Sequence, residues 1–201
     1  MENFQKKLKG ENDTKLQIFL TAARLFAEKG YNGVSMREIS ELSNVSKPTI
    51  YYYFGSKEGI FRELLETGME YGVAFSRKIA ETDISAKMKL VKIMQQQFRI
   101  SYEHSEFSKF FLMIFLTSEH TPFVEDFKKH VRAHKKLLLN IFKEGISSGE
   151  FGAGANPDLA AEMFVAVTGH FISLQIKSKR KILTDKLAEE IVELLFKGLN
   201  E

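Results

Sequence analysis

"SMREISELSNVSKPTIYYYFGSKEGIF", residues 35–61, contains the signals of two short helices joined by a tight turn. It opens with Ser-x-x-Glu, the pattern of a capping box, in which hydroxyl and carboxylate accept backbone N–H groups at a helix start. Ser46 followed by Pro48 marks a second start, because proline is tolerated in a first turn where its missing N–H would have no partner. We therefore predict helices from Met36 to about Leu42 and from Ser46 to Gly55.

The residues between these helices favour a helix-turn-helix. Ser40 is small enough for a helix crossing, and Asn44 is the non-glycine residue that best tolerates a positive φ. Ile39, Val45 and Ile50 have the spacing needed to form a small core between the two helices.

The remainder of the chain has the apolar spacing of helices, and no segment alternates with the period of a strand. We predict an all-α fold of about nine helices. Besides the two above, they are expected from Asp13 or Thr14 to Gly30, from Ser56 to near Ile79, and at about 85–104, 106–118, 122–147, 157–178 and 184–199.

The composition of the chain excludes several kinds of functional site and several cellular locations. The 201 residues contain no cysteine, which excludes disulfides, thiolate metal sites and cysteine nucleophiles. The longest apolar run, "FFLMIFL" at 110–116, is far shorter than the roughly 20 residues that span a bilayer, and no secretion signal follows the N-terminal lysines. We expect a soluble cytoplasmic protein with no membrane partner. The net charge of +3 permits a local nucleic-acid-binding patch without arguing for one.

At the quoted stretch the chain resembles the DNA-binding region of the TetR family of bacterial transcriptional regulators. The resemblance covers about residues 12–65, and its motif pieces are Ser35–Ser40, Val45–Phe54 and Ser56–Glu58. It implies a DNA-binding domain at 1–58 and a helical effector-binding and dimerisation domain at 59–201. The implied function is a homodimeric repressor on a palindromic operator, released by a small, largely apolar effector.

The second short helix has two faces. At 100° per residue, Ile50, Tyr53 and Phe54 turn toward the small core, whereas Lys47, Thr49, Tyr51 and Tyr52 project away from it. The family resemblance implies base contacts from Lys47, Pro48 and Thr49, and phosphate contacts from Ser35, Arg37, Tyr51, Tyr52 and Lys57. Ser46, which caps the helix, completes the predicted DNA-binding set.

An effector site and a dimer interface are predicted farther along the chain. The aromatic-rich segment 95–116 is either packed core or the lining of an effector cavity, with Phe98, Tyr102, Phe111 and Phe115 as its candidate contacts. His170 is either a packed histidine, in the core or at an interface, or a polar anchor for the effector. Apolar stripes on the last two helices predict a four-helix dimer interface formed by Met163, Val167, Phe171, Leu174, Leu187, Ile191 and Leu194.

Other chemistries are not supported. His130 and His134 lie four apart among many lysines, and we interpret them as part of a solvated basic face rather than a metal site. Because the sequence offers no nucleophile with its base, no paired acid and base and no ligand set, we expect neither an enzyme nor a cofactor. The alternative function is a DNA-binding protein that a protein partner regulates, or that has no small-molecule effector.

Overall fold

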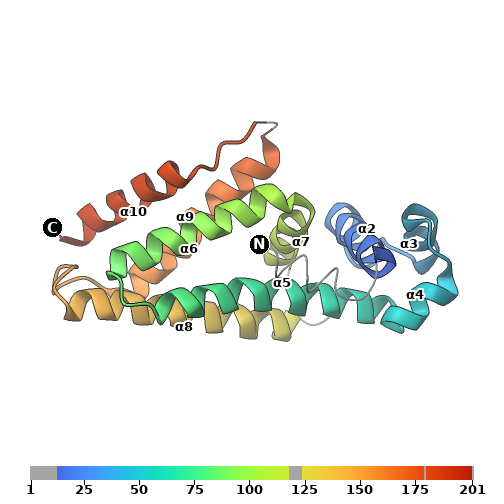
Figure 1. The fold of residues 1–201 in the computed structure, drawn as a ribbon, viewed down its shortest axis with the longest axis horizontal. Coiled ribbons are helices and arrows are strands. Elements are labelled where there is room, and N and C mark those ends of the chain that lie inside the picture. Colours follow the sequence, from blue (N-terminus) through green and yellow to red (C-terminus); the bar gives the residue numbers. More distant parts are fainter. Residues whose placement is uncertain (1–12, 118–123, 179, 201) are drawn as a thin grey trace. The chain divides into compact units, whose positions relative to one another are not determined.

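The computed structural model describes residues 13–117, 124–178 and 180–200. All regular structure in these ranges is α-helical, which confirms the predicted fold class (Figure 1). The helices are α2 (Asp13–Lys29), α3 (Met36–Ser43), α4 (Lys47–Phe54), α5 (Lys57–Ala80), α6 (Ala86–Glu103), α7 (Ser105–Thr117), α8 (Val124–Ser147), α9 (Pro157–Lys177) and α10 (Asp185–Asn200). The predicted helix starts and ends agree with these bounds to within a few residues.

The chain forms two compact units. Among the described residues, the first contains 13–71, 106–117 and 124–127, and the second contains 72–105, 128–178 and 180–200. Helix α5 passes from one unit to the other between Tyr71 and Gly72, and α7 belongs to the first unit although it follows α6 of the second. The predicted boundary after residue 58 is a different division of the chain and stays a prediction.

The first unit has an aromatic core. Figure 1 shows α2, α3 and α4 grouped together, with α4 leading directly into α5. The ring of Phe26 on α2 lies 5.1 Å from that of Phe61 on α5, and Phe110 of α7 lies 5.2 Å from Phe61. Phe107 of α7 packs on Phe19 of α2 at 5.3 Å. These edge and tilted ring contacts attach α7 to the first unit.

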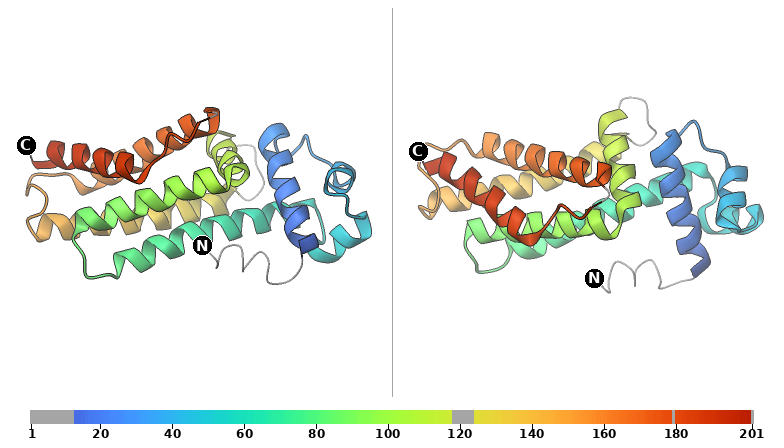
Figure 2. Two further views of the ribbon diagram at one scale, coloured as in Figure 1. Left: turned by 45° about the horizontal axis from the view of Figure 1, so that its top comes forward. Right: turned by 90° about the horizontal axis from the view of Figure 1, so that it is seen from above.

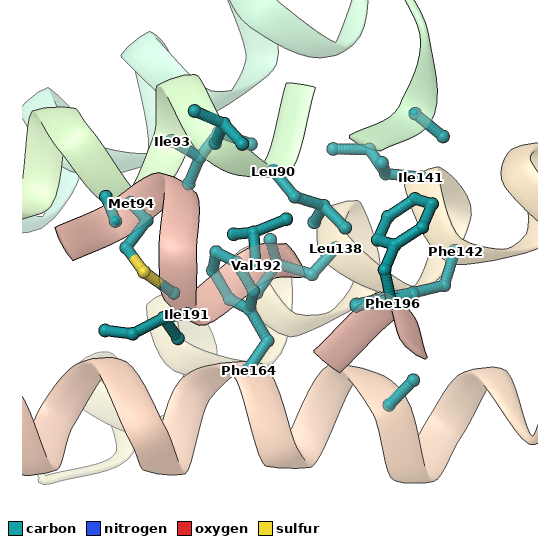
Figure 3. Packing of buried hydrophobic residues seen from close by; sticks show 14 of the residues in the cluster. Leu90, Ile93, Met94, Leu138, Ile141, Phe142, Phe164, Ile191, Val192 and Phe196 are labelled. Atoms are coloured by element: carbon teal, nitrogen blue, oxygen red, sulfur yellow. The ribbon is translucent and has the colours of Figure 1, made fainter. Parts of the chain in front are cut away.

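The second unit is a helical bundle with one continuous hydrophobic cluster. Figure 2 shows α6, α9 and α10 side by side, and Figure 3 shows the side chains that α6, α8, α9 and α10 bury between them. Each large apolar side chain buried there contributes about 1.5–3 kcal/mol relative to an exposed one. The labelled members are Leu90, Ile93, Met94, Leu138, Ile141, Phe142, Phe164, Ile191, Val192 and Phe196.

Helix α9 carries more apolar surface than the single chain covers. By length and composition alone it is the one helix among the described residues that could cross a membrane, and only 28% of its apolar window is buried. Its inner face buries Ala161, Phe164 and Thr168, whereas Met163 and Leu174 are 44% and 39% exposed. The outer face therefore presents apolar side chains that the single chain leaves uncovered.

Candidate DNA-binding surface and effector region

The turn between α3 and α4 has helix-turn-helix geometry. Asn44 has φ 51° and is the one non-glycine residue with positive φ among those described. The hydroxyl of Ser40 donates to the carbonyl of Val45 at 2.7 Å, which holds the end of α3 against the turn. Ile39 and Ile50 are fully buried and Val45 is 9% exposed. The predicted turn and small core are confirmed.

The N-terminus of α4 is capped from within. The hydroxyl of Ser46 accepts from the backbone N–H of Thr49 at 3.4 Å and shares a 2.8 Å hydrogen bond with the Thr49 hydroxyl. Pro48 occupies the first turn, where no N–H is needed. Lys47 and Pro48 are exposed and Thr49 is half-buried. The N-terminus of α4 therefore presents the exposed cation of Lys47 beside the hydroxyls of Ser46 and Thr49, which are hydrogen-bonded to each other.

The tyrosines of α4 divide between two faces. Tyr51 is 48% exposed and Tyr52 is 83% exposed, whereas Phe54 is 8% exposed and Tyr53 is half-buried. The ring of Tyr53 packs edge-on against Tyr52 at 5.3 Å. The predicted separation of the two faces is confirmed for Tyr51, Tyr52 and Phe54, whereas Thr49 and Tyr53, predicted on opposite faces, are both half-buried. A tyrosine held in this way presents its hydroxyl at a small entropic cost, since its ring has few rotatable bonds.

Helix α3 begins beside this surface. The Ser35 hydroxyl accepts from the backbone N–H of Glu38 at 3.1 Å, which confirms the predicted capping hydroxyl. Arg37 is exposed and its Nε donates to the carboxylate of Glu41 at 2.7 Å, one turn along the helix. Because exposed pairs of this kind contribute only about 0.3–0.5 kcal/mol, a phosphate can exchange with Glu41 as the partner of Arg37.

Lys57 is placed differently from the other predicted phosphate contacts. Its ammonium donates to the carbonyls of Tyr31 at 3.1 Å and Val34 at 3.0 Å, and it lies 4.2 Å from the centroid of the Tyr31 ring. The side chain is partly buried, whereas Ser35, Arg37 and Tyr52 are exposed. No sequence pattern predicted this arrangement, because Tyr31 lies 26 residues away in a turn.

The candidate effector contacts divide between the two units. On the second unit, Phe98 is 2% exposed within the core and Tyr102 is 49% exposed, with the Lys181 ammonium 4.7 Å above its ring. His170 is exposed, which rules out its interpretation as a core histidine and leaves the interface and effector interpretations open. On the first unit, α7 carries Phe111, half-buried, and Phe115, 60% exposed. Packed core therefore describes Phe98 and not Tyr102 or Phe115.

The position of His134 in the structure differs from the one predicted from the sequence. Its Nε2 lies 3.3 Å from the Ser76 hydroxyl on α5 and 3.2 Å from the Gln97 amide nitrogen on α6. Desolvation lowers the pKa of His134 to about 4, so the ring is neutral near pH 7. The interpretation as a solvated basic face was wrong for His134, because this face of α8 turns inward. The cluster escaped prediction since its three members come from three helices.

An open apolar groove of about 890 Å³ runs between α9, α10 and the loop before α9. Five of the predicted dimer residues line it, namely Met163, Val167, Phe171, Ile191 and Leu194. Leu194 is 69% exposed, whereas Ile191 is 6% exposed and belongs to the core of its own chain. Ile191 therefore has little surface to give an interface. Leu174 is exposed and Leu187 is half-buried.

Comparisons with known proteins agree with this geometry. The family model described as "Bacterial regulatory proteins, tetR family" matches residues 18–64, from α2 into α5. The fatty acid metabolism regulator protein of Bacillus subtilis is 24% identical over 186 residues, which is 92% of this chain and 95% of that protein.

Solved structures share the whole fold. PfmR, a TetR family transcriptional regulator from Thermus thermophilus, has a TM-score of 0.74 and 25% identity over 92% of this chain and 96% of its own. FadR from Bacillus subtilis, solved in complex with stearoyl-CoA, has a TM-score of 0.69 and 23% identity over 91% and 98%. The chain therefore has the DNA-binding region of the tetR family of bacterial regulatory proteins at residues 18–64, and over its whole length it is similar to regulators of that family.

Proposed function

We propose that this chain is a homodimeric repressor that leaves its operator when a ligand with a long apolar chain binds among its helices. The observation that carries the proposal is that α4 has one buried and one exposed face. Ile50 and Phe54 are buried, whereas Lys47 at the capped N-terminus and Tyr52 farther along the helix are exposed to solvent. A recognition helix needs this division, because one face must pack and the other must enter a groove. The proposal assigns no catalytic step to the chain and places it in the cytoplasm with the DNA.

On the operator, residues 1–58 act as the DNA-binding domain. Lys47, Pro48 and Thr49 at the start of α4 are assigned to base edges, because recognition helices enter the major groove by their N-terminal residues. Phosphates are assigned to Ser35, Arg37, Ser46, Tyr51 and Tyr52. All of these residues except Thr49, which is half-buried, are exposed, which supports their assignment.

The effector is assigned to residues 59–201 and to the class of long-chain fatty acyl thioesters. Similarity to Bacillus subtilis proteins supports this class, because the sequence match is named a regulator of fatty acid metabolism and the matching FadR structure was solved with stearoyl-CoA. Within this chain, the exposed Tyr102 and His170 of the second unit are the proposed contacts, whereas Phe98 is packed core and the predicted contacts Phe111 and Phe115 lie on the first unit. Aromatic rings suit an acyl chain because they offer large apolar surfaces with few degrees of freedom to lose.

Coupling to DNA is assigned to α5 and α7. Helix α7 follows α6 after a single residue, His104, yet its Phe107 and Phe110 pack into the first unit. A ligand that displaces α6 or α7 would therefore disturb the packing of α2 and α5 around Phe110. Helix α5 begins at Lys57, directly after the recognition helix, so the same disturbance changes the population of DNA-competent dimers.

Dimerisation is assigned to the outer faces of α9 and α10. The exposed apolar residues Met163, Leu174 and Leu194 would lie against a second copy, together with Val167, Phe171 and Leu187. Covering the groove would remove from water the apolar surface that the single chain leaves open.

The experiment is a melting and DNA-release assay with stearoyl-CoA, stearate and CoA. A ligand of the folded state must raise the melting temperature, so stearoyl-CoA is expected to raise it and CoA alone is not. Stearoyl-CoA should also release a bound duplex, and a saturating duplex should weaken stearoyl-CoA binding by the same factor. DNA binding without any response to these ligands would favour regulation by another effector or by a protein partner.

A further inference from the structure

Lys57 joins the two ends of the helix-turn-helix. It is the first residue of α5, and Gly55 ends α4 just before it. Its ammonium reaches back to the turn between α2 and α3, where it donates to the carbonyls of Tyr31 and Val34 at 3.1 and 3.0 Å. One cation thus connects the exit of the recognition helix to the entry of α3.

The surface on which this cation rests is rigid. The Tyr31 ring, 4.2 Å from the ammonium, is 9% exposed and packs on Phe26 at 5.9 Å and on Phe61 at 5.1 Å. Val34 is 2% exposed and directly precedes Ser35, the cap of α3. Because core packing fixes both residues, the cation–π contact and the hydrogen bonds hold Lys57 in one place.

This arrangement differs from that of a phosphate clamp. A lysine that neutralises a phosphate directs its N–H groups outward, whereas two of the three N–H donors of Lys57 are used on carbonyls. Within the turn, the carbonyl of Tyr31 also accepts a hydrogen bond from the Val34 N–H, at a long distance of 3.5 Å. This hydrogen bond is too weak to replace the one from the Lys57 ammonium. Moving the ammonium to a phosphate would therefore leave backbone acceptors poorly paired.

We propose that Lys57 is a positioning residue for DNA binding, which holds the N-terminus of α3, with Ser35 and Arg37, in register with the exposed face of α4. The proposal rests on the DNA-binding function above and changes the role assigned to one residue. A compact ammonium suits the site because it fits between two carbonyls and an aromatic face, where a planar guanidinium cannot place its donors in the same way.

The test compares Lys57→Met with Lys47→Met, the matched change at an exposed lysine on α4. The probe is a duplex that the unmodified chain selects from a random-sequence pool, and affinity is measured against salt well below the melting temperature. Losing a phosphate contact makes the plot of log affinity against log salt shallower by about 0.9 per lysine, or roughly 1.8 per dimer. We expect Lys57→Met to bind roughly ten-fold more weakly with an unchanged slope.

A second readout follows the turn itself. Backbone amides at 31–38 should exchange faster with deuterium in Lys57→Met and at the wild-type rate in Lys47→Met. Tyr31→Leu removes the ring beneath the cation without changing charge, and it should also weaken binding at constant slope. If Lys57→Met does not fold, Lys57→Arg replaces it and is expected to bind more weakly than wild type although the charge is kept.

Several results would overturn the proposal. They are a slope about 1.8 shallower in Lys57→Met, unchanged affinity in that variant or in Tyr31→Leu, and wild-type affinity in Lys57→Arg. If the unmodified chain selects no duplex, the proposed function fails, and the exchange measurement still decides whether Lys57 orders the turn.

Discussion

Gly68 of α5 lies directly against the ring of Phe111 on α7, so that a methyl group at Gly68 would overlap ring carbons of Phe111. One turn farther along the same helix, a methyl group at Gly72 would meet no atom within 4 Å. The two glycines therefore differ in their physical role, because only the first makes room for a neighbouring helix.

Alanine at these two positions should have opposite effects on stability. Gly72→Ala should raise the free energy of unfolding by about 0.5–1 kcal/mol, because it removes a helix-interior glycine without a steric clash. Gly68→Ala should lower it by about 1–3 kcal/mol, since Phe111 must move. Urea denaturation of both variants measures the difference. Equal stabilisation by both would contradict the packing of α7 on α5.

Removing the Tyr52 hydroxyl should weaken DNA binding without changing sequence preference. Tyr52 is 83% exposed, and its hydroxyl is assigned to a phosphate, which carries no sequence information. Losing one such hydrogen bond costs about 0.5–1.5 kcal/mol and a dimer loses two, so Tyr52→Phe should bind roughly five- to a hundred-fold more weakly to cognate and scrambled duplexes alike. Tyr102→Phe, an exposed tyrosine of the second unit, is the control. A change in sequence preference would assign Tyr52 to a base instead.

His134 should make the protein less stable in mild acid. Its pKa is lowered to about 4 in the folded state, from about 6.5 in an unfolded chain. Between these values the unfolded chain binds more protons, so stability is full above about pH 6.5 and falls as the pH decreases toward 4. Because the ring keeps some exposure, we expect a loss on the order of 1–3 kcal/mol.

His134→Gln measures this contribution. The amide keeps a polar group near Ser76 and Gln97 but cannot take up a proton in this range, so the variant should lose less stability between about pH 7.5 and 4.5 than wild type does. His130→Gln, one turn earlier on α8, is the matched change and should retain the wild-type profile. If stability depends on pH in the same way in all three proteins, protonation of His134 is not linked to unfolding.

A charge on the outer face of α10 should prevent dimerisation. Leu194 is 69% exposed and lines the apolar groove, so Leu194→Glu would place a carboxylate where a second copy is expected to pack. Lys186→Glu on the same helix changes charge at a solvated site and is the control. Light scattering at micromolar concentration should give the mass of a single chain for Leu194→Glu and the mass of two chains for the control. A two-chain mass for both would place the interface elsewhere.

The helices and the helix-turn-helix could be predicted from residues close together in the chain. Ser35 and Ser46 cap helices through hydroxyls that bond to N–H groups three residues away, and Asn44 adopts its positive φ within the turn it terminates. These features depend on neighbouring residues, so capping chemistry and helical period are sufficient to predict them. The exposed face of α4 followed from the same period.

The meeting of distant residues could be seen only in the folded chain. Lys57 binds a turn 23 to 26 residues earlier, His134 meets side chains 37 and 58 residues away, and α7 packs in the first unit although the helix before it lies in the second. A three- or four-residue period tells which face of a helix is apolar. It cannot tell which helix will cover that face, because that choice depends on the packing of the whole core.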